Sequence, residues 1–399
     1  MKPVEITQDI HWIGVNDEKT ELFEGLWPIK DEGISYNSYL IKGGKTALID
    51  LCKDIYQEEY LAELKTLVDP ASIDYLVVNH MEPDHSGAMR AFLELAPQAV
   101  ILCTQKAVKM MDDFFGITEN IHAIGDGETL DLGGHKLQFA TVPMVHWPET
   151  MVTFDQTSGV LFSCDAFGGY GRLMDGIFDD DYGDISFFEK ESLRYYANIV
   201  AAFSKPVLNA GEKLAGLKIK IVAPSHGLVW RKNPVHIIDL YLKWSGYGKG
   251  QAENKVTLMF GSMYGNTANA AEAITRGLRA SGVEYETFDV RNTHISYILP
   301  SIWISQGIAI GAPTYEGSLF PGMAQALLMA EFKRMFNKDA VYFGSYGWGG
   351  GAQRYLGAQL ERLKWNLVES LEFAGGPTSE ELAQLTDLGM SFGKRVKNG

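Results

Sequence analysis

The chain has 399 residues, of which 46% are hydrophobic and 21% are charged. This length predicts two or three domains, and this balance is typical of a soluble globular protein. No run of 18 apolar residues occurs, so we expect no membrane span, and the N-terminus lacks the pattern of a signal peptide. The three cysteines are far apart, which argues against a disulfide framework and favours a reducing cytoplasm.

The formal net charge of −15 is concentrated in the first part of the chain. Residues 251–399 contain 14 acidic and 13 basic side chains, which leaves 36 acidic and 22 basic side chains for residues 1–250. So acidic a surface repels phosphate backbones and disfavours nucleic-acid binding. Together with the glycine-rich segment 245–251, the change in charge predicts a domain boundary near residue 250.

The first 250 residues alternate between strand-like and helix-like segments. Residues 36–41 and 46–50 are predicted strands joined by a glycine turn, and 58–67 is a predicted helix that ends before an Asp-Pro pair. Further strands are expected over 73–78, 136–140, 142–145, 150–155, 160–163 and 219–224, and an amphipathic run covers 237–244. Many strands with interspersed helices favour two sheets covered by helices.

The second part of the chain has a more regular alternation. Residues 256–260, 285–290, 307–311 and 340–344 are predicted strands, and 267–281 is a predicted helix that ends before Gly282. Strands alternating with helices in this order predict a parallel, doubly wound sheet. The whole chain is therefore expected to be of the α/β class.

A dense group of potential metal ligands follows the predicted strand 73–78. Four of the six residues from 80 to 85 carry ligand side chains, namely His80, Glu82, Asp84 and His85. Three further candidates each follow an apolar segment, and these are His146, Asp165 and His226. Four histidines and three carboxylates suit two metal ions, especially if one carboxylate bridges them. The other histidines lack such neighbours, and we interpret them as structural or surface residues.

This order of ligands resembles the metal motif of the metallo-β-lactamase-like proteins, whose fold is an αββα sandwich. Their hydrolase members typically bind zinc and have a histidine where this chain has Glu82. The more anionic shell of a glutamate suits iron better than zinc, and the glutamate form is similar to that of the flavodiiron proteins of the two-domain A-type. The resemblance implies one iron at His80, Glu82 and His146, a second at Asp84, His85 and His226, and Asp165 as the bridge.

Two further positions take their interpretation from this resemblance. Tyr195 matches a tyrosine that lies beside the iron ligands in the family, although a core aromatic is the alternative interpretation. Many members have a histidine after the phenylalanine that corresponds to Phe23, and this chain has Glu24 there, close to Trp27. That departure concerns the supply of protons and leaves the predicted iron site unchanged.

Three loops of the second part follow predicted strands. The first offers hydroxyls and backbone N–H groups at the start of a helix, which is typical of an anion site, and it lacks the lysine of a Walker A loop. Each loop alone would be an ordinary glycine-containing loop, but the three in order resemble the FMN site of a flavodoxin, with Trp348 or Tyr315 stacked on the flavin. The candidate FMN-binding residues are Ser262, Met263, Tyr264, Gly265, Asn266, Thr267, Pro313, Thr314, Tyr315, Glu316, Gly317, Ser345, Tyr346, Gly347, Trp348, Gly349 and Gly350.

The two resemblances meet in the flavodiiron proteins, which join a metallo-β-lactamase-like domain, here 1–250, to a flavodoxin-like domain, here 251–399. They imply an oxidoreductase that reduces O2 to water and/or NO to N2O at two irons, with electrons delivered through FMN. The donor would be a separate protein such as rubredoxin, because the chain has no four-cysteine rubredoxin module. The family also implies a head-to-tail homodimer or a dimer of dimers. The alternative is a zinc hydrolase with a flavodoxin-like appendage.

Overall fold

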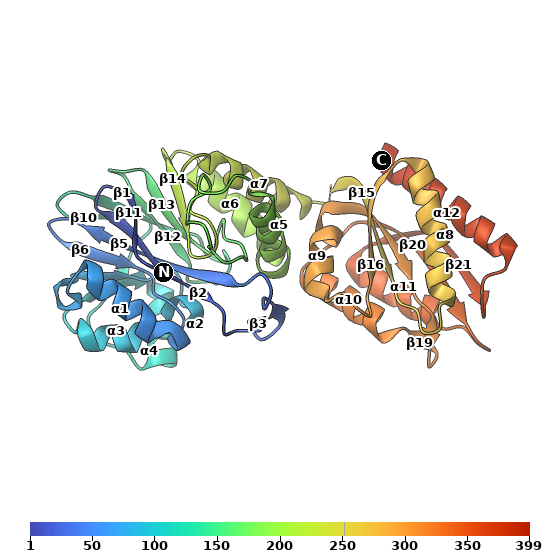
Figure 1. The fold of residues 1–399 in the computed structure, drawn as a ribbon, viewed down its shortest axis with the longest axis horizontal. Helices are drawn as coiled ribbons and strands as arrows, with labels where there is room; N and C mark the ends of the chain where they lie inside the picture. The colour runs from blue at the N-terminus through green and yellow to red at the C-terminus, as the bar shows by residue number, and fades with distance from the viewer. Residues whose placement is uncertain (251) are drawn as a thin grey trace. The chain divides into compact units, whose positions relative to one another are not determined.

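The computed structural model describes residues 1–250 and 252–399, and the chain divides into two compact units (Figure 1). Unit 1 comprises Met1–Tyr196 and Lys205–Leu242, and unit 2 comprises Ala197–Ser204 and Lys243–Gly399. The predicted linker 245–251 differs from the structure in its first three residues, which belong to the helix α7 (Pro234–Tyr247), and Gln251 lies outside the described residues. The assignment of 1–250 and 251–399 as separate domains stays a prediction.

Unit 1 contains two sheets with helices on their outer sides, which is the predicted αββα sandwich (Figure 1). The larger sheet has the order β1-β2-β5-β6-β7-β8-β9 and is antiparallel as far as β6 and parallel from there to β9. Its strands are β1 (Val4–Thr7), β2 (Ile10–Asp17), β5 (Ile34–Lys42), β6 (Thr46–Ile49), β7 (Tyr75–Val77), β8 (Val100–Thr104) and β9 (Ile121–Ile124). A separate hairpin pairs β3 (Leu22–Phe23) with β4 (Trp27–Pro28).

The smaller sheet of unit 1 has the order β10-β11-β12-β13-β14, and only its last pair of strands is parallel. Its strands are β10 (Thr129–Asp131), β11 (Lys136–Thr141), β12 (Met151–Asp155), β13 (Val160–Cys164) and β14 (Ile221–Pro224). The remaining helices of unit 1 are α1 (Gln57–Leu67), α2 (Pro83–Ser86), α3 (Met89–Leu95), α4 (Gln105–Phe115), α5 (Ser186–Tyr195) and α6 (Ser204–Leu214). The predicted hairpin, the predicted helix 58–67 and most predicted strands are thereby confirmed.

One predicted strand of unit 1 is wrong. Strand β11 ends at Thr141 and β12 begins at Met151, so residues 142–145 belong to a loop, in which Met144 has a φ of 65°. The apolar pattern arises because Val142 and Val145 are buried at 3% exposure each. A loop that packs its own side chains into the core thus imitates the short apolar run of a buried strand.

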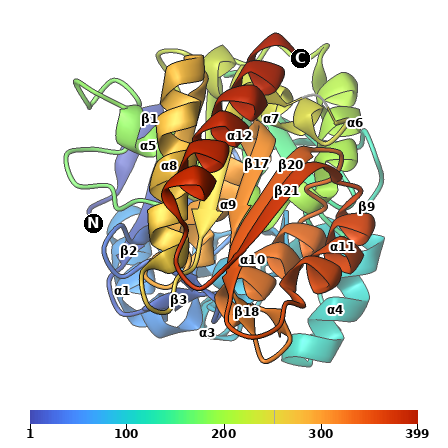
Figure 2. The ribbon, with the colours of Figure 1, turned by 90° about the vertical axis from the view of Figure 1, so that its right-hand side faces the viewer.

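Unit 2 is built on one parallel sheet with the order β16-β15-β17-β20-β21, as predicted for a doubly wound fold. Helices α8 and α12 lie side by side on one face, and α9, α10 and α11 cover the other (Figures 1 and 2). The strands are β15 (Glu253–Phe260), β16 (Glu284–Asp289), β17 (Ser305–Gly311), β20 (Asp339–Tyr346) and β21 (Asn366–Ala374), and β18 (Thr314–Tyr315) pairs with β19 (Ser318–Leu319). The helices are α8 (Asn266–Ser281), α9 (Ile295–Ile304), α10 (Pro321–Phe332), α11 (Ala352–Leu363) and α12 (Ser379–Asn398). None of the helices in the described parts is long and apolar enough to cross a bilayer.

Helices α8 and α12 approach each other closely through two glycines. A Cβ atom on Gly277 would collide with the carbonyl oxygen of Thr386 and the amide nitrogen of Met390, and one on Gly389 would collide with the backbone of Ile274. We expect Gly277→Ala to lower the free energy of unfolding of unit 2 by about 1–3 kcal/mol, because an added methyl group overpacks this interface. Denaturant melts followed by circular dichroism would measure this loss.

The matched control for that substitution is Gly357→Ala in α11. A Cβ atom there meets nothing within 4 Å, so the better helix propensity of alanine should raise stability by about 0.5–1 kcal/mol. Equal effects of the two substitutions would contradict the close contact between α8 and α12.

Candidate metal centre and flavin cavity

The seven predicted ligand side chains come from four segments that follow strands of unit 1. His80 to His85 follow β7 and enter α2, His146 lies in the loop between β11 and β12, Asp165 follows β13, and His226 follows β14. The structure brings all seven into two adjoining groups. Their side chains are buried or, for Glu82, half-buried. Since isolated charges are costly to bury, this many ionisable groups require a common neutralising partner.

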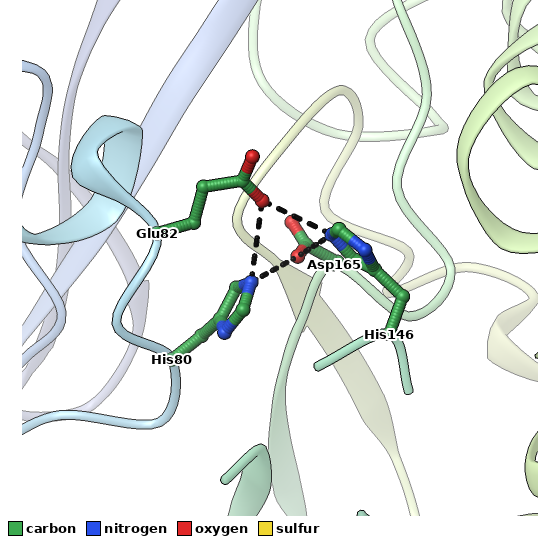
Figure 3. Close-up of side chains that lie close together, drawn as sticks. All are labelled: His80, Glu82, His146 and Asp165. Atoms are coloured by element: carbon green, nitrogen blue, oxygen red, sulfur yellow. Dashed lines mark hydrogen bonds and ion pairs between the residues drawn. The ribbon is translucent and has the colours of Figure 1, made fainter. Parts of the chain in front are cut away.

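The first group consists of His80, Glu82, His146 and Asp165, whose side chains point at one centre (Figure 3). The Nε2 atom of His80 lies 3.3 Å from Glu82 Oε2 and 3.2 Å from Asp165 Oδ2. The Nε2 atom of His146 lies 3.1 Å and 3.2 Å from the same two oxygens. Two imidazole nitrogens and two carboxylate oxygens thus surround one point.

The second group consists of Asp84, His85 and His226, and it adjoins the other oxygen of Asp165. The Nε2 atom of His85 lies 2.8 Å from Asp165 Oδ1 and 3.4 Å from Asp84 Oδ1. The Nε2 atom of His226 lies 3.3 Å from Asp165 Oδ1 and 3.3 Å from Asp84 Oδ2. Asp165 therefore turns Oδ2 toward one group and Oδ1 toward the other, which is the geometry that a bridging carboxylate needs.

The electrostatics of the cluster call for positive charge at its centre. Burial alone would raise the pKa of the Asp165 carboxyl, but the imidazoles of His85, His146 and His226 hold it well below its usual range. Burial alone would lower the pKa of His226, but the neighbouring Asp165 and Asp84 carboxylates raise it to about 10. In the same way Asp165 and Glu82 overcome burial and raise the pKa of His146 to about 9. Protons or metal cations can meet this demand.

Several buried polar atoms at the centre fit a metal ion. Both carboxylate oxygens of Asp84, Oδ2 of Asp165 and Nε2 of His226 have no hydrogen-bond partner of good geometry within residues 1–250 and 252–399. Buried polar atoms of this kind usually find a partner, and a bound cation would satisfy all four. Imidazole nitrogens and carboxylate oxygens together suit iron, manganese or zinc. The residues present therefore fit two metal ions that share Asp165.

Hydrogen bonds behind the cluster orient two of the imidazoles. Nδ1 of His80 lies 2.6 Å from Oε1 of the buried Glu149, which also accepts from the N–H of Met81 at 3.0 Å. Nδ1 of His226 lies 2.8 Å from the carbonyl oxygen of Ser35. Both contacts turn Nε2 toward the centre. Sequence reasoning missed Glu149, whose only signal is its position three residues after His146, and the Ser35 carbonyl leaves no signal in the sequence.

Aromatic side chains cover the second group. The Tyr195 ring at the end of α5 is 1% exposed and lies 5.4 Å from the His226 ring, and burial raises the pKa of its hydroxyl well above the usual value. The Phe23 ring, from the β3–β4 hairpin, lies 5.7 Å from the His226 ring. The exposed Glu24 has a φ of 50°, and its carboxylate accepts a hydrogen bond from Nε1 of Trp27 at 2.9 Å. Glu24 thus stabilises the turn that presents Phe23.

The three glycine-containing loops of unit 2 line one cavity of about 600 Å³ at the carboxyl end of its sheet. Trp348 and Tyr315, the two predicted stacking residues, both line it, with exposures of 103% and 41%. Flat rings beside a cavity of this size suit a planar cofactor such as a flavin. A Cβ atom on Gly351, where α11 begins, would collide with Gly317, so close backbone packing shapes this wall.

Three of the predicted FMN residues belong to the first loop but do not line the cavity, and these are Ser262, Gly265 and Thr267. Ser262 and Thr267 are each 1% exposed, and the Ser262 hydroxyl accepts from the N–H of Gly265 at 3.1 Å. The Thr267 and Ser345 hydroxyls are 3.1 Å apart and so link the first loop to the third. The cavity also includes Gly375, after β21, which sequence reasoning missed because it looks like any glycine after a strand.

Two family models match the chain, one in each unit. Residues 34–227 match the ODP family beta lactamase model, and residues 258–388 match the flavodoxin model. The first range includes all seven candidate metal ligands, and the second includes the three candidate FMN loops.

Individual proteins match nearly the whole chain. It is 35% identical over 404 aligned residues to the nitric oxide reductase of Moorella thermoacetica, with 99% of each chain covered. The rubredoxin oxygen:oxidoreductase of Desulfovibrio gigas has a TM-score of 0.94 at 28% identity and covers 100% of this chain and 99% of its own. The flavodiiron protein of Giardia intestinalis has a TM-score of 0.93 at 28% identity, with 99% and 97% covered. This chain therefore belongs to the flavodiiron protein family.

Proposed function

We propose that this protein is an oxidoreductase that reduces nitric oxide to nitrous oxide at two iron ions, with electrons supplied through FMN. The observation that carries the proposal is Asp165, whose two oxygens face two groups of ligands at 2.8–3.3 Å. The relative from Moorella thermoacetica, named a nitric oxide reductase, supports this reaction. The reaction consumes two NO, two protons and two electrons and yields one N2O and one water.

The seven ligand side chains take the roles that the family resemblance implies. His80, Glu82 and His146 would hold one iron, Asp84, His85 and His226 would hold the other, and Asp165 would be shared by the two. When bound, the irons supply electrons and open coordination positions for the gas. Glu149 and the Ser35 carbonyl hold the imidazoles in the orientation that this task needs. Phe23 and Tyr195 exclude water from the side of His226.

FMN occupies the cavity of unit 2 in this proposal. The N-terminus of α8 and the hydroxyls of the first loop favour a phosphate group. Trp348 and Tyr315 are both placed to stack on the ring, and the choice between them stays open. When bound and reduced, FMN would supply the electrons that the reaction consumes. The family resemblance implies a head-to-tail homodimer or a dimer of dimers, and we propose the same assembly for this chain.

Dioxygen is the second candidate substrate. The relative from Desulfovibrio gigas, at a TM-score of 0.94, is named a rubredoxin oxygen:oxidoreductase. Its name also supports a rubredoxin-like protein as the separate electron donor, and water as the product of O2 reduction stays a prediction. A cytoplasmic location stays a prediction, in keeping with three free, buried cysteines.

The test combines metal analysis, a flavin spectrum and gas consumption. Purified protein should contain about two irons and one FMN per chain, and the chemically reduced protein should consume NO faster than O2. Zinc in a colourless protein that hydrolyses esters or lactams would overturn the proposal in favour of the zinc hydrolase. Faster consumption of O2 than of NO would make O2 the preferred substrate and would leave the assignment of the metal ligands unchanged.

Removing the charge behind His80 should weaken metal binding. We expect Glu149→Gln to lower the iron affinity about 10–100-fold, because a neutral amide orients the imidazole less firmly than a carboxylate. Iron retention during titration with a chelator would measure this. Glu128→Gln is the matched control, since that exposed carboxylate pairs with His122 outside the cluster. Equal iron retention in both variants would contradict the role of Glu149.

A further inference from the structure

A cavity of unit 1 is lined in part by residues next in the chain to two of the candidate iron ligands. It measures about 290 Å³ and lies against helices α6 and α7 and strands β12 and β13. All sixteen of its lining residues are apolar or glycine. The lining includes Val145 and Ala166, which directly adjoin His146 and Asp165 in the chain.

The lining residues of this cavity differ in exposure. Val145 and Ala166 are 3% and 8% exposed, so the part of the lining next to His146 and Asp165 is buried. Ala215 is exposed and Val235 is 56% exposed, so another part of the lining adjoins solvent. The cavity therefore has lining residues at the surface and lining residues in the loops that carry two of the candidate metal ligands.

The apolar lining of this cavity favours small apolar molecules over water. A water molecule needs two to four polar partners, and a cavity without them stays dry and binds small apolar molecules instead. The groups around the metal cluster, in contrast, are charged and attract water and ions. An apolar cavity whose lining adjoins a charged site thus separates neutral diatomic gases from water, protons and anions.

We propose that this cavity binds small apolar gas molecules and feeds them to the metal centre past Val145 and Ala166. This inference rests on the proposed function, because NO and O2 are the gases that the centre would consume. It adds an entry route on the α6–α7 side, whose lining includes neither Phe23 nor Tyr195.

Blocking the cavity tests the proposal. Ala210 lines it and is half-buried in α6, so Ala210→Phe fills the space with a phenyl ring. We expect kcat/KM for the gas to fall about tenfold while kcat at saturating gas stays within about twofold, because access is lost and the chemistry is kept. Iron and FMN contents should equal those of the unmodified protein.

The matched control is Asn209→Phe, which places the same ring on the exposed neighbour of Ala210, outside the cavity. It should leave kcat/KM unchanged. Ala215→Phe, at the exposed part of the lining, serves as a second blocking variant should Ala210→Phe fail to fold. An unchanged kcat/KM in a folded blocking variant would overturn the proposal.

Xenon gives a readout that does not depend on catalysis. Crystals pressurised with xenon should show the atom in this cavity in the unmodified protein and in Asn209→Phe, and not in Ala210→Phe. Absence of xenon from the unmodified protein would overturn the proposal. A protein that binds xenon here but holds no iron or consumes no gas would instead overturn the proposed function, so the two failures are distinguishable.

Discussion

Asp165→Asn is expected to remove most bound iron and to lower gas reduction at least about 100-fold, while FMN stays bound. Asp165 faces both ligand groups, at 3.2 Å from Nε2 of His80 and of His146 and at 2.8 Å from Nε2 of His85. An asparagine keeps the shape but offers one oxygen and one NH2 group, so it cannot bridge two cations. Iron analysis, the flavin absorption band and NO consumption would measure the three outcomes on one sample.

The control must show that replacing a buried aspartate elsewhere in unit 1 does not by itself remove iron. Asp155→Asn serves this purpose, because Asp155 is also fully buried and also pairs with a histidine, His135, at 2.8 Å, yet lies outside the ligand groups. We expect it to cost stability and to keep both iron and activity. Loss of iron from both variants would point to general unfolding, and retained iron in Asp165→Asn would overturn the bridging role.

The convergence of the candidate metal ligands was predicted from their clustering in the chain and from their positions after apolar segments. His80, Glu82, Asp84 and His85 follow one buried strand, and Asp165 follows another. Asp165 and His226 follow the parallel neighbours β13 and β14 and therefore lie at one edge of the smaller sheet. His80 to His85 follow β7 of the larger sheet, so their meeting with Asp165 depends on the packing of the two sheets, which strand ends alone do not predict. His146 also joins the group, but from a loop and not from a strand end, because the strand pattern of residues 142–145 is wrong.

The remaining parts of the site depend on contacts that composition does not encode. Glu149 contacts His80 across 69 positions of sequence, and a lone carboxylate in a loop gives no hint of such a partner. The Ser35 contact to His226 uses a backbone carbonyl, which every residue has. Strand β21 escaped prediction because the exposed Glu369 and the half-buried Glu372 give an edge strand a polar pattern. The identities of the cofactors, FMN and iron, were predicted from the family resemblance and not from the periodicity of the sequence.

A substitution in the first candidate FMN loop should have the opposite effect to Asp165→Asn, namely loss of FMN with iron retained. Thr267→Val is expected to weaken FMN binding about 10–100-fold, since it removes the buried hydroxyl that lies 3.1 Å from Ser345 and unties the first and third loops. Iron in unit 1 should stay at the level of the unmodified protein, whereas gas reduction driven by a flavin-dependent donor should fall in proportion to the FMN lost. Fluorescence titration with FMN and iron analysis would measure both.

Thr257→Val provides the matched control for this loss of flavin. Thr257 is also fully buried in unit 2, and its hydroxyl lies 2.8 Å from that of Ser301 and 3.0 Å from that of Ser305, away from the cavity loops. The same isosteric change there removes a comparable hydrogen bond, so it should cost about 1–3 kcal/mol of stability and leave FMN affinity unchanged. If both variants lost FMN equally, the effect would come from the fold of unit 2. If only Thr267→Val lost FMN, the contact of the Thr267 hydroxyl with Ser345, which links the first loop to the third, would be needed for FMN binding.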